Sequence, residues 1–384
     1  MQDVIEFVRD YYQTEAFVPL HVPSFVGNEQ KYVTETIKSS FVSSVGKYVD
    51  QFEEQIANYC GSEAAVAVVN GTSALQVALR IAGVKHNDLV ITQSLNFVAG
   101  CNAIAHNGAE PVFVDISEST LGMSPEDLRD WLEENCEIDG EGFCRHFQTG
   151  KRVMACVPMH TFGHPLEIED IADICQLWKL ALIEDVAEGL GSFKEGRHIG
   201  NYGLMGAFSF NGNKIITTGG GGMLVSNSAT AQKAKHLTTT AKIPHAYEYI
   251  HDEIGYNFRM PNLNAALGCA QMESLKDLLS HKRDLAMAYK NFFQGSQYEF
   301  VDEPEGCQSN FWLNAILCED KAERDNFLET TNNAGVMTRP AWQPMHSLDI
   351  FSNCLSGPMS VTEMIANRLV NIPSSPKSAI KKAG

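Results

Sequence analysis

Lys214 stands in a stretch that could present a reactive amine. It lies in an Asn/Gly-rich connection between two β-prone runs, 207–210 and 223–226, and four glycines follow it at 219–222. Such a connection must pass close to other backbone or to a ligand. A lysine there is usually solvated, but an amine held in a cleft can lose its proton and attack a carbonyl carbon. Because the glycines follow the lysine and GxxxxGK[ST] is absent, the stretch does not predict a phosphate-binding P-loop.

Three further features follow predicted strands and could serve a carbonyl cofactor. Thr72 and Ser73 open a helix whose free N–H groups suit a phosphate, although an ordinary helix cap explains them as well. Phe97 could stack on a planar ring or belong to the core. Asp185 could pair with a heterocyclic nitrogen or face a helix N-terminus. Together with Lys214, these residues form the set that pyridoxal 5′-phosphate (PLP) requires.

Alternating apolar runs and amphipathic helices place these residues. The predicted strands are 64–69, 89–92, 111–115, 152–158 and 180–184, and the predicted helices include 73–82, 98–107, 124–135 and 169–179. Near-continuous apolar strands separated by helices predict an α/β domain whose mostly parallel sheet is covered on both faces. In such sheets ligands gather at the carboxyl ends of the strands.

The C-terminal part has a different pattern. After Asn262 the sequence becomes more helical, and segments around 311–317, 326–335 and 362–371 predict a smaller α+β domain. We therefore expect an N-terminal segment and large domain in residues 1–245, and a small C-terminal domain in residues 246–384.

Composition limits the partners. The 384 residues carry a formal charge of -18, which disfavours nonspecific binding to nucleic acids or anionic membranes. The ten cysteines form no CxxC pair and no metal-ligand spacing, so we expect reduced core residues of a cytoplasmic protein and no metal site. Neither a signal-peptide pattern nor a long apolar span is evident.

Several motifs resemble the DegT/DnrJ/EryC1/StrS family of PLP-dependent sugar aminotransferases, which have the aspartate aminotransferase-like (type I) fold. They run in the family's order over residues 18 to about 350. They are Phe41-Val-Ser-Ser-Val-Gly46, Asn70-Gly-Thr-Ser-Ala-Leu75, Ser94-Leu-Asn-Phe-Val98, His160-Thr-Phe-Gly163, Glu184-Asp-Val-Ala-Glu188, Phe208-Ser-Phe-Asn-Gly-Asn-Lys214 and Gly255-Tyr-Asn-Phe-Arg-Met-Pro261.

The resemblance implies a role for each matching residue. Lys214 would form the Schiff base with the cofactor, and Asp185 would pair with the pyridine nitrogen. The other implied cofactor contacts are Phe97 on the ring, Glu188 by the 3′-oxygen or ring face, Thr72, Ser73 and Ser209 on the phosphate, and Asn257 reaching the phosphate from the partner subunit of a homodimer. The dimer would share its active sites.

Two positions depart from the family pattern. Glu188 stands where glutamine or histidine is frequent, which leaves its protonation and contact open, and the run 219–222 replaces Gly-Glu-Gly-Gly. Lys214 is intact, which argues against the histidine-containing dehydratase branch. A dehydratase of the same fold and a noncatalytic PLP-binding regulatory protein remain the alternative functions.

Within the family, the segments 255–266 and 22–28 look most like the LegC group. That resemblance implies transfer of an amino group, with L-glutamate as the expected donor, to C4 of a nucleotide-linked 4-keto-6-deoxy sugar. The expected sugar is UDP-linked and N-acetylated, on a bacillosamine- or legionaminic-type route to a polysaccharide. Candidates for the substrate pyrophosphate are Ser43, Ser44, Arg259 and His346, and each has a structural role as its alternative.

Overall fold

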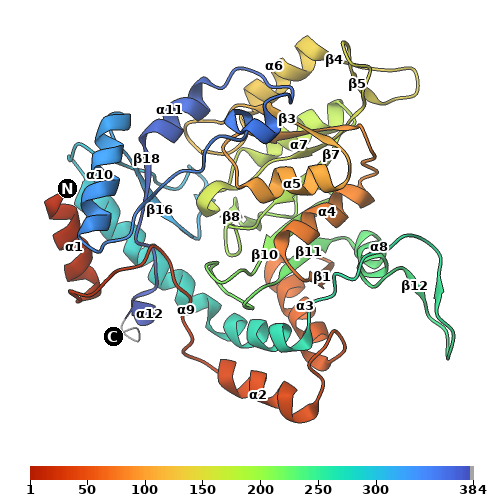
Figure 1. The fold of residues 1–384 in the computed structure, drawn as a ribbon, viewed down its shortest axis with the longest axis horizontal. Coiled ribbons are helices and arrows are strands. Elements are labelled where there is room, and N and C mark those ends of the chain that lie inside the picture. Colours follow the sequence, from red (N-terminus) through yellow and green to blue (C-terminus); the bar gives the residue numbers. More distant parts are fainter. Residues whose placement is uncertain (381–384) are drawn as a thin grey trace.

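The computed structural model describes residues 1–380, and a seven-stranded sheet forms its centre (Figure 1). The strand order is β1-β11-β10-β7-β6-β2-β3. The strands are β1 (Ala64–Val68), β2 (Leu89–Gln93), β3 (Glu110–Val114), β6 (Val153–Val157), β7 (Ala181–Asp185), β10 (Met205–Ser209) and β11 (Gly222–Ser226). Only β11 runs against its neighbours among these strands. The mostly parallel α/β sheet predicted from the sequence is confirmed.

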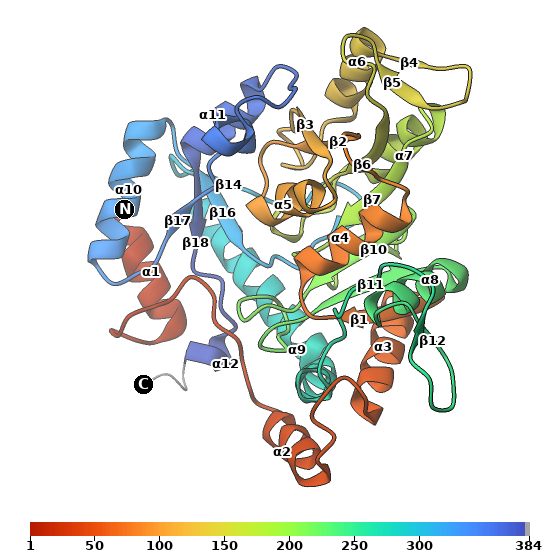
Figure 2. The same cartoon turned by 45° about the vertical axis from the view of Figure 1, so that its right-hand side comes forward.

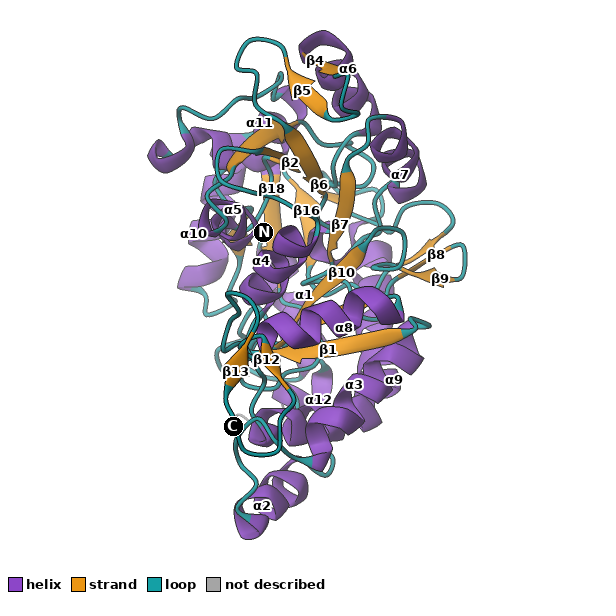
Figure 3. Ribbon diagram, turned by 90° about the vertical axis from the view of Figure 1, so that its right-hand side faces the viewer, coloured by secondary structure: helices purple, strands orange, loops and turns teal. Residues whose placement is uncertain are grey.

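Both faces of this sheet are buried, because successive side chains of a strand point to opposite sides. In β1, Val66 and Val68 pack into one apolar cluster, whereas Ala65 and Ala67 pack into another. Helices α4 (Gly71–Ile81), α5 (Val98–His106) and α8 (Ser228–Thr238) cover the first face, and α3 (Lys47–Cys60), α6 (Pro125–Asn135), α7 (Ile168–Leu177) and α9 (Asn262–Phe293) cover the second (Figures 2 and 3). The two-sided burial explains the continuous apolar runs of the strands.

A four-stranded antiparallel sheet forms the centre of the C-terminal part. Its order is β14-β16-β18-β17, with β14 (Glu299–Phe300), β16 (Asn314–Leu317), β17 (Arg339–Pro340) and β18 (Leu369–Ile372). Helices α10 (Lys321–Asn333) and α11 (Ser360–Arg368) accompany it. The N-terminal helix α1 (Gln2–Tyr12) packs Val4 and Val8 into the same cluster as Phe327, so the two chain segments lie side by side (Figures 1 and 2).

Helix α9 joins the two parts of the molecule. Its 32 residues span about 48 Å at 1.5 Å per residue. Cys269 and Leu275 pack against the large sheet, whereas Leu285 and Tyr289 pack into the C-terminal cluster. Because α9 contacts both parts and α1 packs with the C-terminal one, the division at residue 245 remains a prediction.

One further helix and several short elements lie around these sheets. They are α2 (Glu29–Ser39), α12 (Lys377–Ile380), the strand pair β4 (Cys136–Ile138) and β5 (Cys144–His146), the three-stranded group β8 (Phe193–Lys194), β9 (Arg197–His198) and β15 (Cys307–Gln308), and three 3₁₀ turns at Thr161–Gly163, Met345–Ser347 and Asp349–Phe351. All ten cysteines are free thiols, and eight of them are buried. Within residues 1–380, no helix combines the length and apolar character that crossing a membrane requires.

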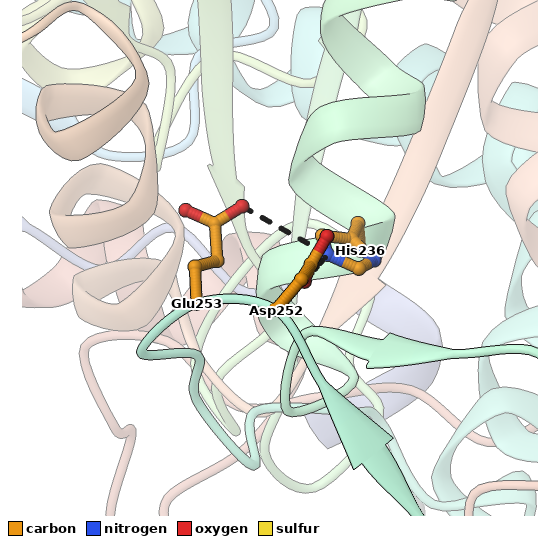
Figure 4. A group of neighbouring side chains, drawn as sticks. All are labelled: His236, Asp252 and Glu253. Carbon is orange, nitrogen blue, oxygen red and sulfur yellow. Dashed lines mark hydrogen bonds and ion pairs between the residues drawn. The ribbon is translucent and has the colours of Figure 1, made fainter.

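A projecting hairpin of β12 (Lys242–Ile243) and β13 (Ile250–His251) is tied to α8 by charged side chains (Figure 4). His236 Nε2 lies 2.7 Å from Asp252 Oδ1 and 3.8 Å from Glu253 Oε1. Lys233 also pairs with Glu253, and the hydrogen bond from His236 lowers the pKa of Asp252. His236, Asp252 and Glu253 lie close enough together to bind a metal ion. The ion pairs among them already explain the cluster, which ties the hairpin to α8.

Candidate active site

A cavity of about 380 Å³ opens at the carboxyl ends of the main-sheet strands. The sequence-predicted residues that line it are Thr72, Phe97, Asp185, Glu188, Ser209 and Lys214. They come from the ends of β7 and β10, from the start of α4 and from the loops after β2, β7 and β10. The parallel strand direction therefore brings together residues that are up to 142 positions apart (214 − 72).

Lys214 lies in the turn between β10 and β11, where its backbone N–H donates to Asn211 O at 3.0 Å. Its Nζ is 3.4 Å from Glu188 Oε1 and 3.9 Å from the centre of the Trp312 ring. Only 14% of the side chain is exposed. The lysine is therefore held in the cavity, and the solvated alternative for this loop does not apply.

The glycine run allows this loop to return to the sheet. A Cβ on Gly222, the first residue of β11, would approach the Asn70 carbonyl carbon to 2.5 Å. A Cβ on Gly221 would meet Thr218 Oγ1 at 2.2 Å. Real Cβ atoms do not come so close, so the backbone of this loop can pass the start of α4 only as glycine.

The start of α4 and the end of β10 form a cradle for an anion. Asn70 caps the helix by accepting from the Ser73 N–H at 2.7 Å, so the cap is this asparagine and not a threonine or serine. A Cβ on Gly71 would stand 2.9 Å from Ser209 Cβ, which shows how closely the two segments meet. Thr72 and Ser209 line the cavity there, whereas Ser73 is buried outside its lining. The cradle fits the phosphate of PLP.

Two buried acids face the cavity. Asp185 ends β7, and its Oδ1 accepts from the Ala187 N–H at 3.0 Å; burial raises the pKa of this carboxyl. Glu188 Oε2 accepts from the Phe162 N–H at 2.8 Å. Burial raises the pKa of Glu188 to about 7, against the opposing effect of the Lys214 charge. A positive partner would stabilise the charged form of each acid. A protonated ring nitrogen and a lysine ammonium are partners of this kind.

Aromatic side chains form one wall of the cavity. Phe97 is 51% exposed and therefore available to a ligand, and its ring centre lies 6.5 Å from that of Trp342. Trp342 also packs 5.2 Å from Phe162. Sequence reasoning missed Trp312 and Trp342 as cavity residues. The sequence predicts the segment 311–317 only as part of the smaller domain. A tryptophan in an apolar segment is typical of the core, and no local pattern distinguishes Trp312 from that.

The proposed pyrophosphate and partner-subunit residues lie outside this cavity in the described chain. Arg259 pairs with the edge of β1 at Val68, and its Nη2 donates to Asn257 Oδ1 at 3.4 Å. His346 Nδ1 lies 2.7 Å from Ser94 Oγ. The carbonyl of Ser43, which precedes Ser44, accepts from the Asn262 N–H at 2.6 Å. Their binding roles remain predictions.

Comparison with known proteins gives the family. Residues 23–383 match the DegT/DnrJ/EryC1/StrS aminotransferase family. The chain belongs to this family. It is 36% identical to the "Putative pyridoxal phosphate-dependent aminotransferase EpsN" of Bacillus subtilis, over 92% of this chain and 90% of the relative. It is 34% identical to the GDP-perosamine synthase of Escherichia coli O157:H7, over 94% of each chain.

The fold agrees with this family. The aminotransferase TlmJ from Streptoalloteichus hindustanus superposes with a TM-score of 0.85 at 24% identity, over 96% of both chains. As a member of this family the chain is a PLP-dependent aminotransferase, and its fold is the type I fold. The cavity supplies what PLP needs: an amine at Lys214, a buried acid at Asp185 and the phosphate cradle at Thr72 and Ser209.

Proposed function

We propose that the protein transfers an amino group from an amino acid, with L-glutamate as the donor, to C4 of a nucleotide-linked 4-keto-6-deoxy sugar. The observation that carries the proposal is the Lys214 amine, held in a cavity at the strand ends together with the buried acid Asp185. Family membership supports amino transfer, and the sugar nucleotide in the name GDP-perosamine synthase supports the substrate class.

The residues of the cavity divide the work. When bound, PLP supplies an electron sink that stabilises negative charge on the carbon that loses a proton. Lys214 Nζ would carry the covalent attachment and, when free, would accept and return that proton. Asp185 would hold a proton on the ring nitrogen through its carboxylate. Thr72 and Ser209, with the start of α4, would hold the phosphate, and Phe97 would orient the ring.

We also propose a homodimer whose subunits complete each other's sites. Around the Ser43-Ser44 turn, Phe41 is 57% and Val45 66% exposed. On the β12–β13 hairpin, Tyr247 and Tyr249 are each 82% exposed. Apolar side chains this exposed and this closely grouped are typical of protein interfaces. In this dimer Asn257, which follows the hairpin in the chain, would reach the phosphate in the partner's cavity, and Arg259 would reach the substrate.

The substrate is tested with a panel of UDP- and GDP-linked 4-keto sugars, each offered with L-glutamate, and NMR of the product. The expected product is a 4-amino sugar from a UDP-linked N-acetylated substrate. If only the GDP-linked sugar were aminated, the proposed nucleotide would be wrong and the proposed amino transfer would hold. A sugar that loses oxygen without gaining nitrogen would show a dehydratase, and binding of PLP without conversion by any amino donor would show a regulatory protein.

A further inference from the structure

The Lys214 amine has two facing contacts that both favour its charged form. Glu188 Oε1 lies 3.4 Å from Nζ, and the Trp312 ring centre lies 3.9 Å from Nζ. A carboxylate attracts an ammonium directly, and an indole face attracts it through the ring quadrupole. Glu188 itself is 3% exposed and Trp312 4%, so water competes little for either contact.

Both groups are fixed by hydrogen bonds that leave their contact with Lys214 free. The Glu188 oxygen not facing Lys214 accepts from the Phe162 N–H, and the Glu188 backbone carbonyl accepts from Asn310 Nδ2 at 2.7 Å. Trp312 Nε1 donates to the carbonyl of Asn213 at 2.6 Å, which ties the indole to the residue before Lys214. The edge of the indole is therefore hydrogen-bonded to the Lys214 loop, and its face contacts the Lys214 amine.

A buried lysine from α9 holds the backbone of this tryptophan. Lys282 is 1% exposed, and its Nζ donates to Trp312 O at 2.6 Å and to Ser374 O at 2.5 Å. Burial holds the pKa of Lys282 well below its ordinary value. His21, whose ring nitrogens are also buried near Lys214, has its pKa lowered in the same way, chiefly by burial and then by Lys282. Burial thus disfavours positive charge at His21, which lies near Lys214, and at Lys282, which holds the backbone of Trp312.

We propose that Glu188 and Trp312 form a holding site for the Lys214 ammonium between the two halves of an amino transfer, when the lysine is detached and is not acting as the base, and that Lys282 is a positioning residue that keeps Trp312 in this site. This inference rests on the proposed catalytic use of Lys214. Between the two halves of an amino transfer the lysine is detached, and the holding site keeps it beside the reacting atoms instead of in solvent. Glu188 and Trp312 touch the reacting amine, whereas Lys282 acts through Trp312.

The test is competitive acylation of the full-length, PLP-free protein with trace acetic anhydride at about pH 9, where Glu188, with its pKa of about 7, is a carboxylate. Peptide mass spectrometry reads the label. The readout is the labelling of Lys214 relative to Lys276, an exposed lysine on α9. The two contacts cover Nζ of Lys214, whose side chain is only 14% exposed, whereas Lys276 is open to solvent, so we expect low relative labelling in the wild type. W312L and E188Q should raise it about fivefold or more, because each removes one stabilising contact.

Graded variants separate the holding site from general loosening. W312F keeps a ring face and should raise the labelling less than W312L, and K282M should raise it by displacing Trp312. W178F is the matched control. Trp178 packs against a different apolar cluster of the large sheet from the one that contains Trp312, and its indole nitrogen has no hydrogen-bond partner among the described residues. W178F should leave the ratio unchanged.

Unchanged Lys214 labelling in E188Q and W312F, with wild-type circular dichroism, would overturn the proposal. E188Q keeps Trp312, and W312F keeps an aromatic ring at position 312. These two variants therefore test the holding site even if W312L does not fold. The assay contains no sugar. If the labelling contradicts the holding site, the proposal of amino transfer is unaffected. If no keto sugar is aminated, the labelling result is unaffected.

Discussion

At the scale of single residues, the environment of Lys214 is assembled from distant parts of the chain. Its own loop supplies the tight turn, the segment after β7 supplies Glu188, and the segment before β16 supplies Trp312. Glu188 keeps its hydrogen bond from the Phe162 N–H and Trp312 keeps its hydrogen bond to the Asn213 carbonyl when the amine is removed, so its removal should change chemistry more than folding.

Replacing Lys214 with alanine should reduce amino transfer by about a thousandfold or more, because both the attachment point and the mobile base are lost. K214R is the matched variant: it keeps a positive charge near Glu188 but cannot do the same chemistry, so it should be equally inactive. Steady-state rates with circular dichroism check this. Substantial activity in K214A would show that another group carries the reaction.

Asp185 should matter through its charge and not through its shape. D185N keeps the size of the side chain and an oxygen that can accept from the Ala187 N–H, but it cannot hold a proton on a ring nitrogen. We expect proton removal from the amino donor to slow by about a hundredfold or more. Stopped-flow absorbance measures this step. Asp173 is exposed on α7, and D173N should behave as the wild type. An equal loss of rate in D173N would contradict a specific role for the charge of Asp185.

Glu188 makes stability depend on pH in a specific direction. Folding raises its pKa from 4.5 to about 7, so the folded protein binds this proton more tightly than the unfolded chain. The stability of the PLP-free protein should therefore fall as the pH rises from 4.5 to 7, by up to about 3 kcal/mol from this group.

Glu188→Gln imitates the neutral carboxyl and should remove that fall. In urea unfolding, we expect E188Q to be more stable than the wild type by about 1–3 kcal/mol at pH 8 and equal to it near pH 4.5. Parallel stability curves for the two proteins across this range would contradict the assignment of a buried, titrating Glu188.

At the scale of elements, the meeting of β11 with the start of α4 decides the shape of the anion cradle. Gly222→Ala would force its Cβ against the Asn70 backbone at 2.5 Å, and we expect a loss of about 1–3 kcal/mol in unfolding free energy with weaker PLP binding. Gly220→Ala is the matched control, since its Cβ would meet nothing within 4 Å. Equal effects of the two substitutions would show that close approach is not what Gly222 provides.

The elements themselves could be predicted because each has a local signal. The apolar runs gave the main-sheet strands to within one or two residues, and Ser124-Pro125 gave the start of α6, where Ser124 caps the Asp127 N–H. The partners of Lys214 could not be predicted in this way. Trp312 lies 98 positions away (312 − 214), and only the packing of α9 and β16 against the large sheet brings it to the amine.

At the scale of the whole molecule, the exposed apolar groups at the 41–46 turn and the hairpin predict an assembly. Val45→Asp should leave the unfolding free energy of a subunit nearly unchanged, because this side chain is 66% exposed, but it should dissociate the dimer. Analytical ultracentrifugation measures the mass. Leu177→Asp, 69% exposed on α7, should leave a dimer intact. A wild-type protein that sediments as a monomer would contradict the shared-site proposal.

The position of the cofactor attachment tests the whole account most directly. Borohydride reduction of the PLP-loaded protein, followed by peptide mapping, fixes the cofactor to the amine that carries it. We predict a single labelled site at Lys214, and no label in K214A. A label on another lysine, such as Lys282, or no label on the loaded protein, would contradict the assignment of this cavity as the active site.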